Sequence, residues 1–324
     1  MTLHGQDVLH RLPPAPMLAT AGPPPGGDGW VVEPKFDGAR CIARVDSGRA
    51  ELFSRQATNL SLFFPEVATG CSTLGQRDAL LDGEIIVLDA GTRPNFQLLQ
   101  RRLSSPRPRA TLQRRLPARL LVFDVLHLDG QDLTHQPYRV RRNILEGLGL
   151  DRLAPELATS PAWFGLDGRD VLRAMVSAGM EGVVCKAIDS QYQVGRRSRQ
   201  WVKTPYRCSG QFVVGGFVAS SETSVGAVLV GAYDAAGDLS YCGTVSVGFS
   251  HRARRSLYLG LSSIERGTSP FSTASLVERG GRVRWVHPRV VGRIEYREFT
   301  GRLRHPAWKG VLNVDAFTVR LPDC

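Results

Sequence analysis

The sequence lacks the features of a membrane-spanning or disulfide-stapled protein. Its apolar runs, such as Leu120–Leu126 and Phe212–Val218, are strand-length and far shorter than the ~20 residues that a membrane helix needs. No basic stretch followed by an apolar core opens the chain, so we expect no secretion signal. The 6 cysteines form no C-x-x-C pair and lie near no histidine cluster. This pattern disfavours zinc ribbons and disulfide frameworks, and it favours the reduced thiols of a cytoplasmic protein.

Lysine is nearly absent although the chain is basic. Of the 41 basic residues only 4 are lysines, namely Lys35, Lys186, Lys203 and Lys309. Arginine therefore supplies almost every bare positive charge. Lysine can lose its proton and become a nucleophile, whereas arginine effectively cannot. Each remaining lysine is thus a candidate for chemistry, the alternative being that four lysines persisted by chance.

Length and charge narrow the class of protein further. A chain of 324 residues suits two domains, and 42% hydrophobic with 22% charged residues excludes global disorder. The formal net charge of +11 favours a polyanionic partner such as nucleic acid.

The first part of the chain, residues 1–207, is predicted to be an α+β domain. A segment rich in proline and glycine, 13–29, reads as an irregular lead-in. The arginine- and proline-rich stretch Ser104–Arg119 reads equally well as a solvated loop or as a contact to a phosphate backbone. Strands are expected at Trp30–Val32, Cys41–Val45, Ala50–Ser54, Leu80–Leu88, Leu120–Leu128 and Gly182–Lys186. Helices are expected at Phe96–Leu103, Tyr138–Leu148 and Asp170–Ala178.

The second part, residues 208–324, is predicted to be an all-β OB-fold domain, an architecture that often binds nucleic acid. One helix at about Arg252–Ser263 interrupts its strands. The strands are expected at Gln211–Val218, Gly226–Tyr233, Leu239–Val247, Arg282–Trp285 and Val290–Phe299.

Lys35 lies in the sequence Lys35-Phe36-Asp37-Gly38, a K-x-D-G pattern. In a chain with so few lysines this match is uncommon enough to support a hypothesis. One interpretation is a surface turn closed by Asp-Gly. The other is a lysine nucleophile that attacks an electrophilic substrate.

Six blocks of sequence, in order, resemble the motifs of covalent nucleotidyltransferases, the superfamily of ATP-dependent DNA ligases, RNA ligases and mRNA capping enzymes. Together they span nearly the whole first domain. The likeness is greatest to the small bacterial ATP-dependent DNA ligases of end joining and repair. The blocks are Lys35–Arg40, Ser54-Arg55, Leu81–Ile85, Val122–Val125, Glu181–Lys186 and Trp201–Lys203.

The resemblance implies roles for the nucleotide-binding residues. Lys35 would attack the α-phosphorus of ATP and hold AMP as a phosphoramidate. Arg40 and Glu84 would bind the ribose hydroxyls, and Glu33 the adenine edge. Phe123 would stack on the purine. From its apolar strand alone, Phe123 reads better as a core residue.

The resemblance also implies cation and phosphate contacts. Glu181 would hold Mg²⁺ or Mn²⁺, and otherwise reads as a carboxylate at a helix-to-strand junction. Lys186 and Lys203 would neutralise the transferring phosphoryl group. Arg55 would hold the 5′-phosphate of the nick, the alternative being a solvated charge at a strand end.

Two departures from the family pattern concern the lysine-adenylylation step, and the second concerns the contact with pyrophosphate. Position 205 is proline where the family often has a second motif lysine, and the usual C-terminal R-x-D-K motif is missing, with only Asp315 available to align. Lys309 or Arg304 is the predicted replacement cation for the β- and γ-phosphates. A solvated loop charge is an equally good interpretation of Lys309.

The resemblance implies an ATP-dependent DNA ligase that seals nicks with 3′-hydroxyl and 5′-phosphate ends in DNA repair. It would act as a monomer in the cytoplasm, at the nucleoid, with nicked duplex DNA as substrate and a Ku-type end-binding protein or a repair polymerase as partner. One alternative is an RNA ligase or a capping-type enzyme. Another is a catalytically weak nucleic-acid-binding relative.

Overall fold

The computed structural model describes residues 15–105, 110–272 and 283–322. The chain divides into two compact units, Met1–Tyr206 and Arg207–Cys324, and the boundary predicted from the sequence lies one residue later. Each unit has a hydrophobic core of its own. Within the described ranges, no helix combines the length and the apolarity that crossing a membrane requires.

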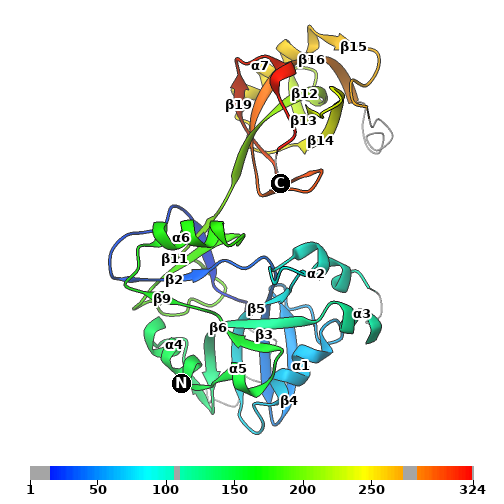
Figure 1. Ribbon diagram of the computed structural model, residues 1–324. Coiled ribbons are helices and arrows are strands. Elements are labelled where there is room, and N and C mark those ends of the chain that lie inside the picture. Colours follow the sequence, from blue (N-terminus) through cyan, green and yellow to red (C-terminus); the bar gives the residue numbers. More distant parts are fainter. Residues whose placement is uncertain (1–14, 106–109, 273–282, 323–324) are drawn as a thin grey trace. The chain divides into compact units, whose positions relative to one another are not determined.

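Two β-sheets form the first unit (Figure 1). The first sheet has the strand order β1-β11-β10-β2-β9. Its strands are β1 (Leu18–Ala21), β11 (Arg197–Pro205), β10 (Gly182–Ala187), β2 (Trp30–Pro34) and β9 (Trp163–Phe164). The second sheet has the order β4-β3-β5-β6-β7, and β8 pairs with β6. Its strands are β4 (Arg49–Ser54), β3 (Ala39–Asp46), β5 (Ala79–Val87), β6 (Ala118–Leu128), β7 (Gln131–Asp132) and β8 (Leu157–Thr159).

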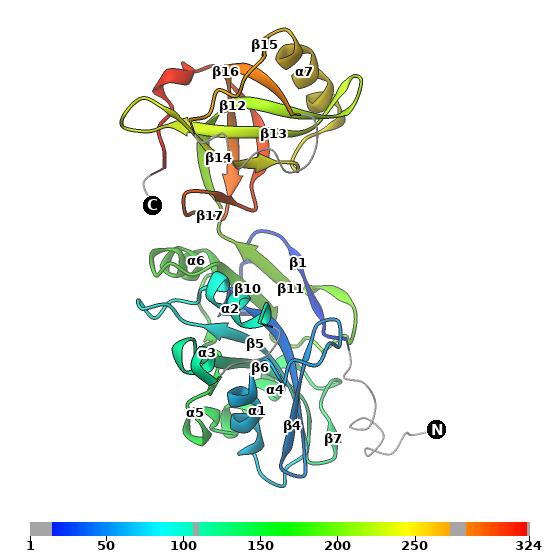
Figure 2. The ribbon, with the colours of Figure 1, turned by 90° about the vertical axis from the view of Figure 1, so that its right-hand side faces the viewer.

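Helices cover these sheets (Figure 2). Helix α6 (Gly168–Ser177) packs on β10 and β2 through a small cluster that includes Val171 and Val183. Four other helices contact the second sheet, and the larger hydrophobic core of the unit lies between this sheet and these helices. They are α1 (Pro65–Ser72), α2 (Phe96–Leu103), α4 (Tyr138–Gly147) and α5 (Leu150–Leu153), and a short helix α3 (Ala110–Arg115) also lies in this unit.

A third apolar cluster joins the two sheets of the first unit. Trp201 on β11 lies edge-on to Phe123 on β6, with ring centroids 6.3 Å apart, and edge-on to Tyr192 at 5.6 Å. Met17, Ile42, Leu80 and Leu126 complete the cluster. Beneath it, Arg141 of α4 forms a fully buried ion pair with Asp124 of β6, at 2.7 Å. These contacts fix the two sheets against each other.

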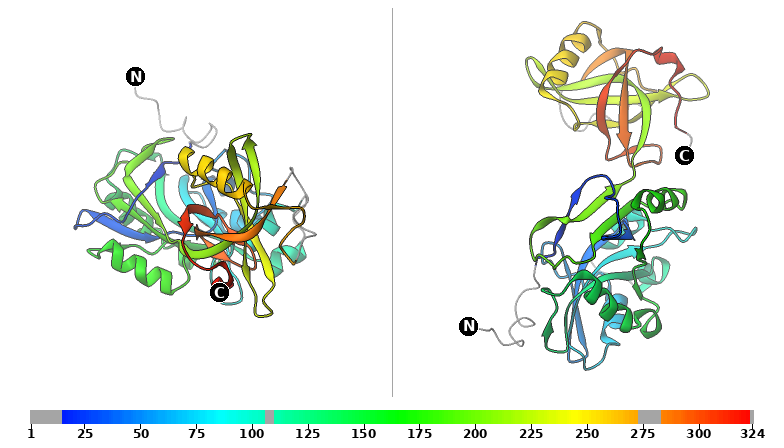
Figure 3. Two further views of the ribbon diagram at one scale, coloured as in Figure 1. Left: turned by 90° about the horizontal axis from the view of Figure 1, so that it is seen from above. Right: turned by 90° about the vertical axis from the view of Figure 1, so that its left-hand side faces the viewer.

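The second unit is a curled sheet that closes on itself (Figure 3). Its path is β14-β13-β12-β16-β19, and a bridge between Val247 and Ala307 joins the two ends. This is the OB-fold barrel that the sequence predicts. The strands are β12 (Cys208–Ser221), β13 (Ser224–Tyr233), β14 (Leu239–Val245), β15 (Glu265–Arg266), β16 (Val283–Tyr296), β17 (Glu298–Phe299), β18 (Leu303–Arg304) and β19 (Ala307–Leu312). Helix α7 (His251–Ser262) packs on β13 and β16, and a 3₁₀ turn spans Ala316–Thr318.

Two predicted loops contain regular structure. The lead-in 13–29 includes strand β1, which pairs in parallel with β11. The local sequence does not reveal this strand, because its partner lies far along the chain. Residues 13 and 14 lie outside the described residues. The stretch Ser104–Arg119 includes helix α3, which ends before Pro117. Residues 106–109 of that stretch also lie outside the described residues.

The predicted strands of the barrel need two corrections. Arg282–Trp285 and Val290–Phe299 are expected as two strands, but one strand, β16, runs from Val283 to Tyr296, and Arg282 lies outside the described residues. The pairing with β12 shifts register around Pro288, so a bulge absorbs the proline without ending the strand. Strand β19 was not predicted. Gly292 on β16 faces Trp308 of β19 so closely that a Cβ there would lie 2.2 Å from the indole ring.

Candidate active site

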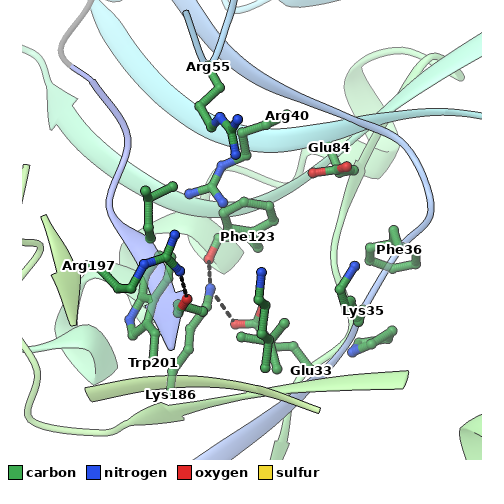
Figure 4. A pocket seen from close by; sticks show the side chains of 15 residues that line it. Glu33, Lys35, Phe36, Arg40, Arg55, Glu84, Phe123, Lys186, Arg197 and Trp201 are labelled. Carbon is green, nitrogen blue, oxygen red and sulfur yellow. Dashed lines mark hydrogen bonds and ion pairs between the residues drawn. The ribbon is translucent and has the colours of Figure 1, made fainter. Parts of the chain in front are cut away.

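A pocket gathers the site residues that were predicted in the first unit, Glu181 excepted (Figure 4). They come from both sheets: Glu33 from β2, Lys186 from β10 and Lys203 from β11 belong to one, and Arg40 from β3 and Glu84 from β5 to the other. The pocket is lined by Leu18, Ala19, Glu33, Pro34, Lys35, Phe36, Arg40, Arg55, Glu84, Phe123, Val184, Lys186, Arg197, Trp201 and Lys203.

The motif glycines explain how this pocket is built. At Gly38 a Cβ would lie 2.3 Å from the carbonyl oxygen of Ile85, so only glycine allows the turn after Lys35 to pack against β5. Gly182 has a φ of +141°, and a Cβ there would lie 2.2 Å from the carbonyl oxygen of Thr204. Its own carbonyl accepts a hydrogen bond from the Lys35 backbone N–H at 2.9 Å. The two motifs are therefore joined through their backbones.

Lys35 and Glu181 form an ion pair at the pocket. The Lys35 Nζ lies 2.5 Å from the Glu181 Oε1. The lysine side chain is 22% exposed and the glutamate side chain 9%. The amine is thus accessible to a ligand while its position is held by a carboxylate.

The inner end of the pocket holds a buried charge pair. Lys186 Nζ lies 2.8 Å from Glu33 Oε1 and donates to the carbonyl oxygen of Phe123 at 3.1 Å. Both charged side chains are almost fully buried. Burial lowers the pKa of Lys186, and the charge of Glu33 opposes this shift. The ammonium also lies 4.4 Å from the ring centroids of Phe123 and Trp201, as Figure 4 shows for this group of side chains.

Arg40 is held by a second polar network. Its guanidinium donates to both carboxylate oxygens of the fully buried Asp82, each at 2.5 Å. Tyr192 also donates to Asp82, at 2.5 Å, and its oxygen accepts from the Met17 backbone N–H at 3.0 Å. The Arg40 guanidinium carbon lies 4.5 Å from the Phe123 ring centroid. Phe123 is 8% exposed, so it lines the pocket and belongs to the buried cluster at once.

The outer end of the pocket is cationic. Lys203 is half-buried, and Arg55 and Arg197 are exposed. Burial, together with the charges of Lys35 and Arg197, lowers the pKa of Lys203. Burial raises the pKa of Glu84 to about 7, although Arg40 and Lys35 act in the opposite direction.

This polarity determines what the pocket can bind. Aromatic rings, a buried carboxylate and a buried ammonium line one end, and three cations line the other end together with Lys35. Such a site suits a ligand with an aromatic, hydrogen-bonding part and an anionic part. A lysine at the anionic part can attack phosphorus, and the surrounding cations stabilise the charge that develops.

Within the described residues, no group of three histidine, cysteine or acidic side chains is arranged to hold a metal ion. Glu181 is the carboxylate that pairs with Lys35. Mg²⁺ takes one or two protein carboxylates and completes its coordination with water and substrate phosphates. The donor set fits such an ion only together with a phosphorylated ligand.

The two predicted cations of the second unit are engaged within the barrel. Lys309 on β19 lies 2.8 Å from Glu295 on β16, and Arg304 on β18 lies 3.6 Å from Glu298 on β17. Asp315, the weak match to the missing motif, caps the 3₁₀ turn by accepting from the Phe317 N–H at 3.0 Å. Their role toward pyrophosphate stays a prediction.

Several residues of the pocket were not predicted. Arg197 lines it and donates to the Ala19 carbonyl oxygen, and Trp201, although part of a motif, had no assigned role. Asp82 and Tyr138 stand behind the lining and hold Arg40 and Glu33. Asp82 falls in a recognised motif and could have been noticed, whereas nothing in the sequence near Tyr138 or Arg197 indicates its neighbours.

Comparison with known proteins identifies two matching family models. The model described as "ATP dependent DNA ligase domain" matches residues 16–204, and "ATP dependent DNA ligase C terminal region" matches residues 221–313.

Individual proteins extend the match along the chain. The multifunctional non-homologous end joining protein LigD of Mycobacterium bovis is 32% identical over 306 residues, which cover 92% of this chain but 38% of that protein. DNA ligase C2 of Mycolicibacterium smegmatis is 33% identical over 270 residues, with 79% and 72% covered. A solved structure of a mycobacterial DNA ligase D, complexed with ATP and MES, is 30% identical. It has a TM-score of 0.56, and the match covers 96% of this chain and 98% of that one.

Proposed function

This chain belongs to the ATP-dependent DNA ligase family, and from that premise we propose that it seals nicks in duplex DNA through a lysyl-AMP intermediate on Lys35. The observation that carries the proposal is the position of Lys35. Its amine lies at the mouth of a pocket with an aromatic, hydrogen-bonding inner end and a cationic outer end. This chain spans 38% of the length of its LigD relative. We therefore propose only the nick-sealing activity for it, and not the other activities that a multifunctional relative has.

The pocket's polarity orients ATP. The purine would enter the inner end, beside Phe123 and Glu33, and the triphosphate would lie toward Lys203, Arg55 and Arg197. Arg40 and Glu84 flank the region between these ends and would bind the ribose. This orientation brings the α-phosphate to the Lys35 amine, which is the near-attack geometry that rate acceleration requires.

Three phosphoryl transfers make up the proposed reaction. The neutral amine of Lys35 attacks the α-phosphorus, the bond to pyrophosphate breaks, and the amine's proton is lost. The 5′-phosphate oxygen of the nick then displaces Lys35 from the phosphorus and takes up AMP. Finally the 3′-hydroxyl attacks the 5′-phosphorus, AMP leaves, and the hydroxyl proton is released. Lys203, at the cationic end of the pocket, would contribute positive charge to these steps. Lys186 would do so from the inner end, where it pairs with Glu33.

A divalent metal ion is proposed to bind at Glu181. Glu181 would hold Mg²⁺ or Mn²⁺, which when bound neutralises phosphate charge. The metal ion and the Lys35 amine would compete for the same Glu181 oxygen, which now lies 2.5 Å from the amine. Binding of the ion would therefore release Lys35 from its carboxylate partner.

Contacts to DNA are proposed for the outer cations and the barrel. Arg55 would hold the 5′-phosphate, and the barrel would add non-specific phosphate contacts, consistent with the net charge of +11. A monomer that repairs chromosomal DNA would act at the nucleoid in the cytoplasm. A Ku-type end-binding protein or a repair polymerase is the proposed partner, and the name of one relative refers to non-homologous end joining.

Sealing assays separate this function from its rivals. We expect closure of a nicked DNA duplex with ATP and Mg²⁺, and weak closure of an RNA nick or with GTP. Preferred sealing of RNA would favour an RNA ligase, and GTP dependence a capping-type enzyme. DNA binding without any sealing would favour a catalytically weak relative.

A further inference from the structure

The carboxylate at the inner end of the pocket is held from one side only. Glu33 Oε1 accepts a hydrogen bond from the Tyr138 hydroxyl and lies 2.8 Å from Lys186 Nζ. Tyr138 is the first residue of α4 and is fully buried. Among the residues that the structure describes, none donates to Glu33 Oε2. Because Glu33 lines the pocket, Oε2 is the acceptor left for a ligand.

Two donors on one oxygen restrict what this carboxylate can do. A carboxylate can only accept hydrogen bonds. The two donors also restrain rotation of the carboxyl group, since any rotation would break a buried hydrogen bond. Burial raises the pKa of Tyr138, and the charge of Glu33 raises it further. The Tyr138 hydroxyl therefore stays protonated and keeps donating.

A fixed, anionic acceptor distinguishes two classes of purine. A 6-amino purine presents N–H donors at this edge, whereas a 6-oxo purine presents an acceptor. A buried site built for one hydrogen-bond pattern strongly rejects the other, because mismatched polar groups stay unpaired.

We propose that Tyr138 is a specificity-determining positioning residue, which locks Glu33 as an acceptor and so selects 6-amino over 6-oxo purine triphosphates. The inference rests on the proposed function, in which the base occupies the inner end of the pocket. Tyr138 acts through Glu33 and does not itself touch the nucleotide.

The test compares ATP with inosine triphosphate, which carries a 6-oxo group. The rate of Lys35 adduct formation is measured against nucleotide concentration for the wild type and for Tyr138→Phe. We expect the variant's ratio of kcat/KM for ATP over inosine triphosphate to fall by about tenfold, mainly through a higher KM for ATP. A merely structural role would lower the melting temperature and leave the ratio unchanged.

Tyr258→Phe is the matched control. Its hydroxyl accepts a hydrogen bond from Arg284 at 2.9 Å in the second unit, so the variant loses one tyrosine hydroxyl and its hydrogen bond outside the unit that contains the pocket. The wild-type ratio is expected for it, and a reduced ratio would overturn the inference.

Glu33→Gln changes the acceptor of the Tyr138 hydrogen bond. This variant replaces Tyr138→Phe as the test if that variant does not fold. Its amide can present a donor to a 6-oxo group, so the ratio should fall at least as far. Adding Tyr138→Phe to Glu33→Gln should change the ratio little, because both act at one group. Folded variants that keep the wild-type ratio would overturn this inference alone. A wild type that forms no adduct from ATP would overturn the proposed function and this inference with it.

Discussion

The three lysines of the first unit meet three different environments. Lys35 is partly exposed beside Glu181, Lys186 is buried against Glu33 and two aromatic rings, and Lys203 is half-buried among cations. Only Lys35 combines access to a ligand with a held position at the pocket mouth. The side chain's surroundings, more than its type, therefore separate the proposed nucleophile from the lysines that are proposed to support the base or the phosphates.

Glu84 couples the state of the pocket to pH. Burial raises its pKa from 4.5 to about 7 in the folded protein. Between these values the unfolded chain has lost the Glu84 proton while the folded chain keeps it, so stability falls as pH rises. Without nucleotide, Glu84→Gln should melt at the wild-type temperature at pH 5 and above it at pH 8.

Thermal melts across this range check the prediction about Glu84. Glu222→Gln, in the exposed turn between β12 and β13, is the control and should match the wild type at both pH values. A Glu84→Gln variant that is less stable than the wild type at pH 8 would show that the ionised carboxylate stabilises the fold.

The site residues predicted in the first unit lie in or beside short motifs that are contiguous in the sequence. Lys35, Glu84 and Lys186 could be located because their motifs are contiguous in the chain. The groups that orient them could not, since Tyr138 reaches Glu33 across 105 positions and Tyr192 reaches Asp82 across 110. Tertiary folding alone brings these hydrogen-bond partners together.

At the scale of elements, strands β18 and β19 carry the predicted substitute for the missing C-terminal motif. Lys309→Ala and Arg304→Ala should slow formation of the Lys35 adduct, because pyrophosphate leaves in that step. Both variants should still seal a nick whose 5′ end already carries AMP, since no pyrophosphate takes part there. Single-turnover rates of the two reactions provide the measurement.

Two outcomes would count against this role of β18 and β19. Adduct formation at the wild-type rate in both variants would mean that other groups orient pyrophosphate. A selective loss of sealing on the pre-adenylylated nick would mean that the segment contacts DNA.

Elements with a strong local pattern were predicted well, and those that depend on distant partners were not. Helix α2 matches its predicted bounds, Phe96–Leu103, because Asn95 caps it and its apolar spacing is regular. Strand β1 was missed because its pairing with β11 lies far along the chain. Strand β19 was missed because Trp308 packs on Gly292, a fit that only the closed barrel creates.

At the scale of the whole molecule, the two units are proposed to divide the work that ligation requires. The first contains every group proposed to bind ATP apart from Lys309 and Arg304, and the second is a barrel proposed to engage DNA. The excess of arginine suits non-specific contact with phosphates, while three of the four lysines line the pocket.

The mass of the intact protein after incubation with ATP and Mg²⁺ tests the central claim most directly. The account predicts that the wild type gains the mass of one AMP, that peptide mapping places it on Lys35, and that pyrophosphate reverses it. Lys35→Arg, shown by its melting curve to be folded, should gain nothing, because arginine stays protonated. An adduct of normal yield on Lys35→Arg, or one mapped to another residue of the wild type, would contradict the account.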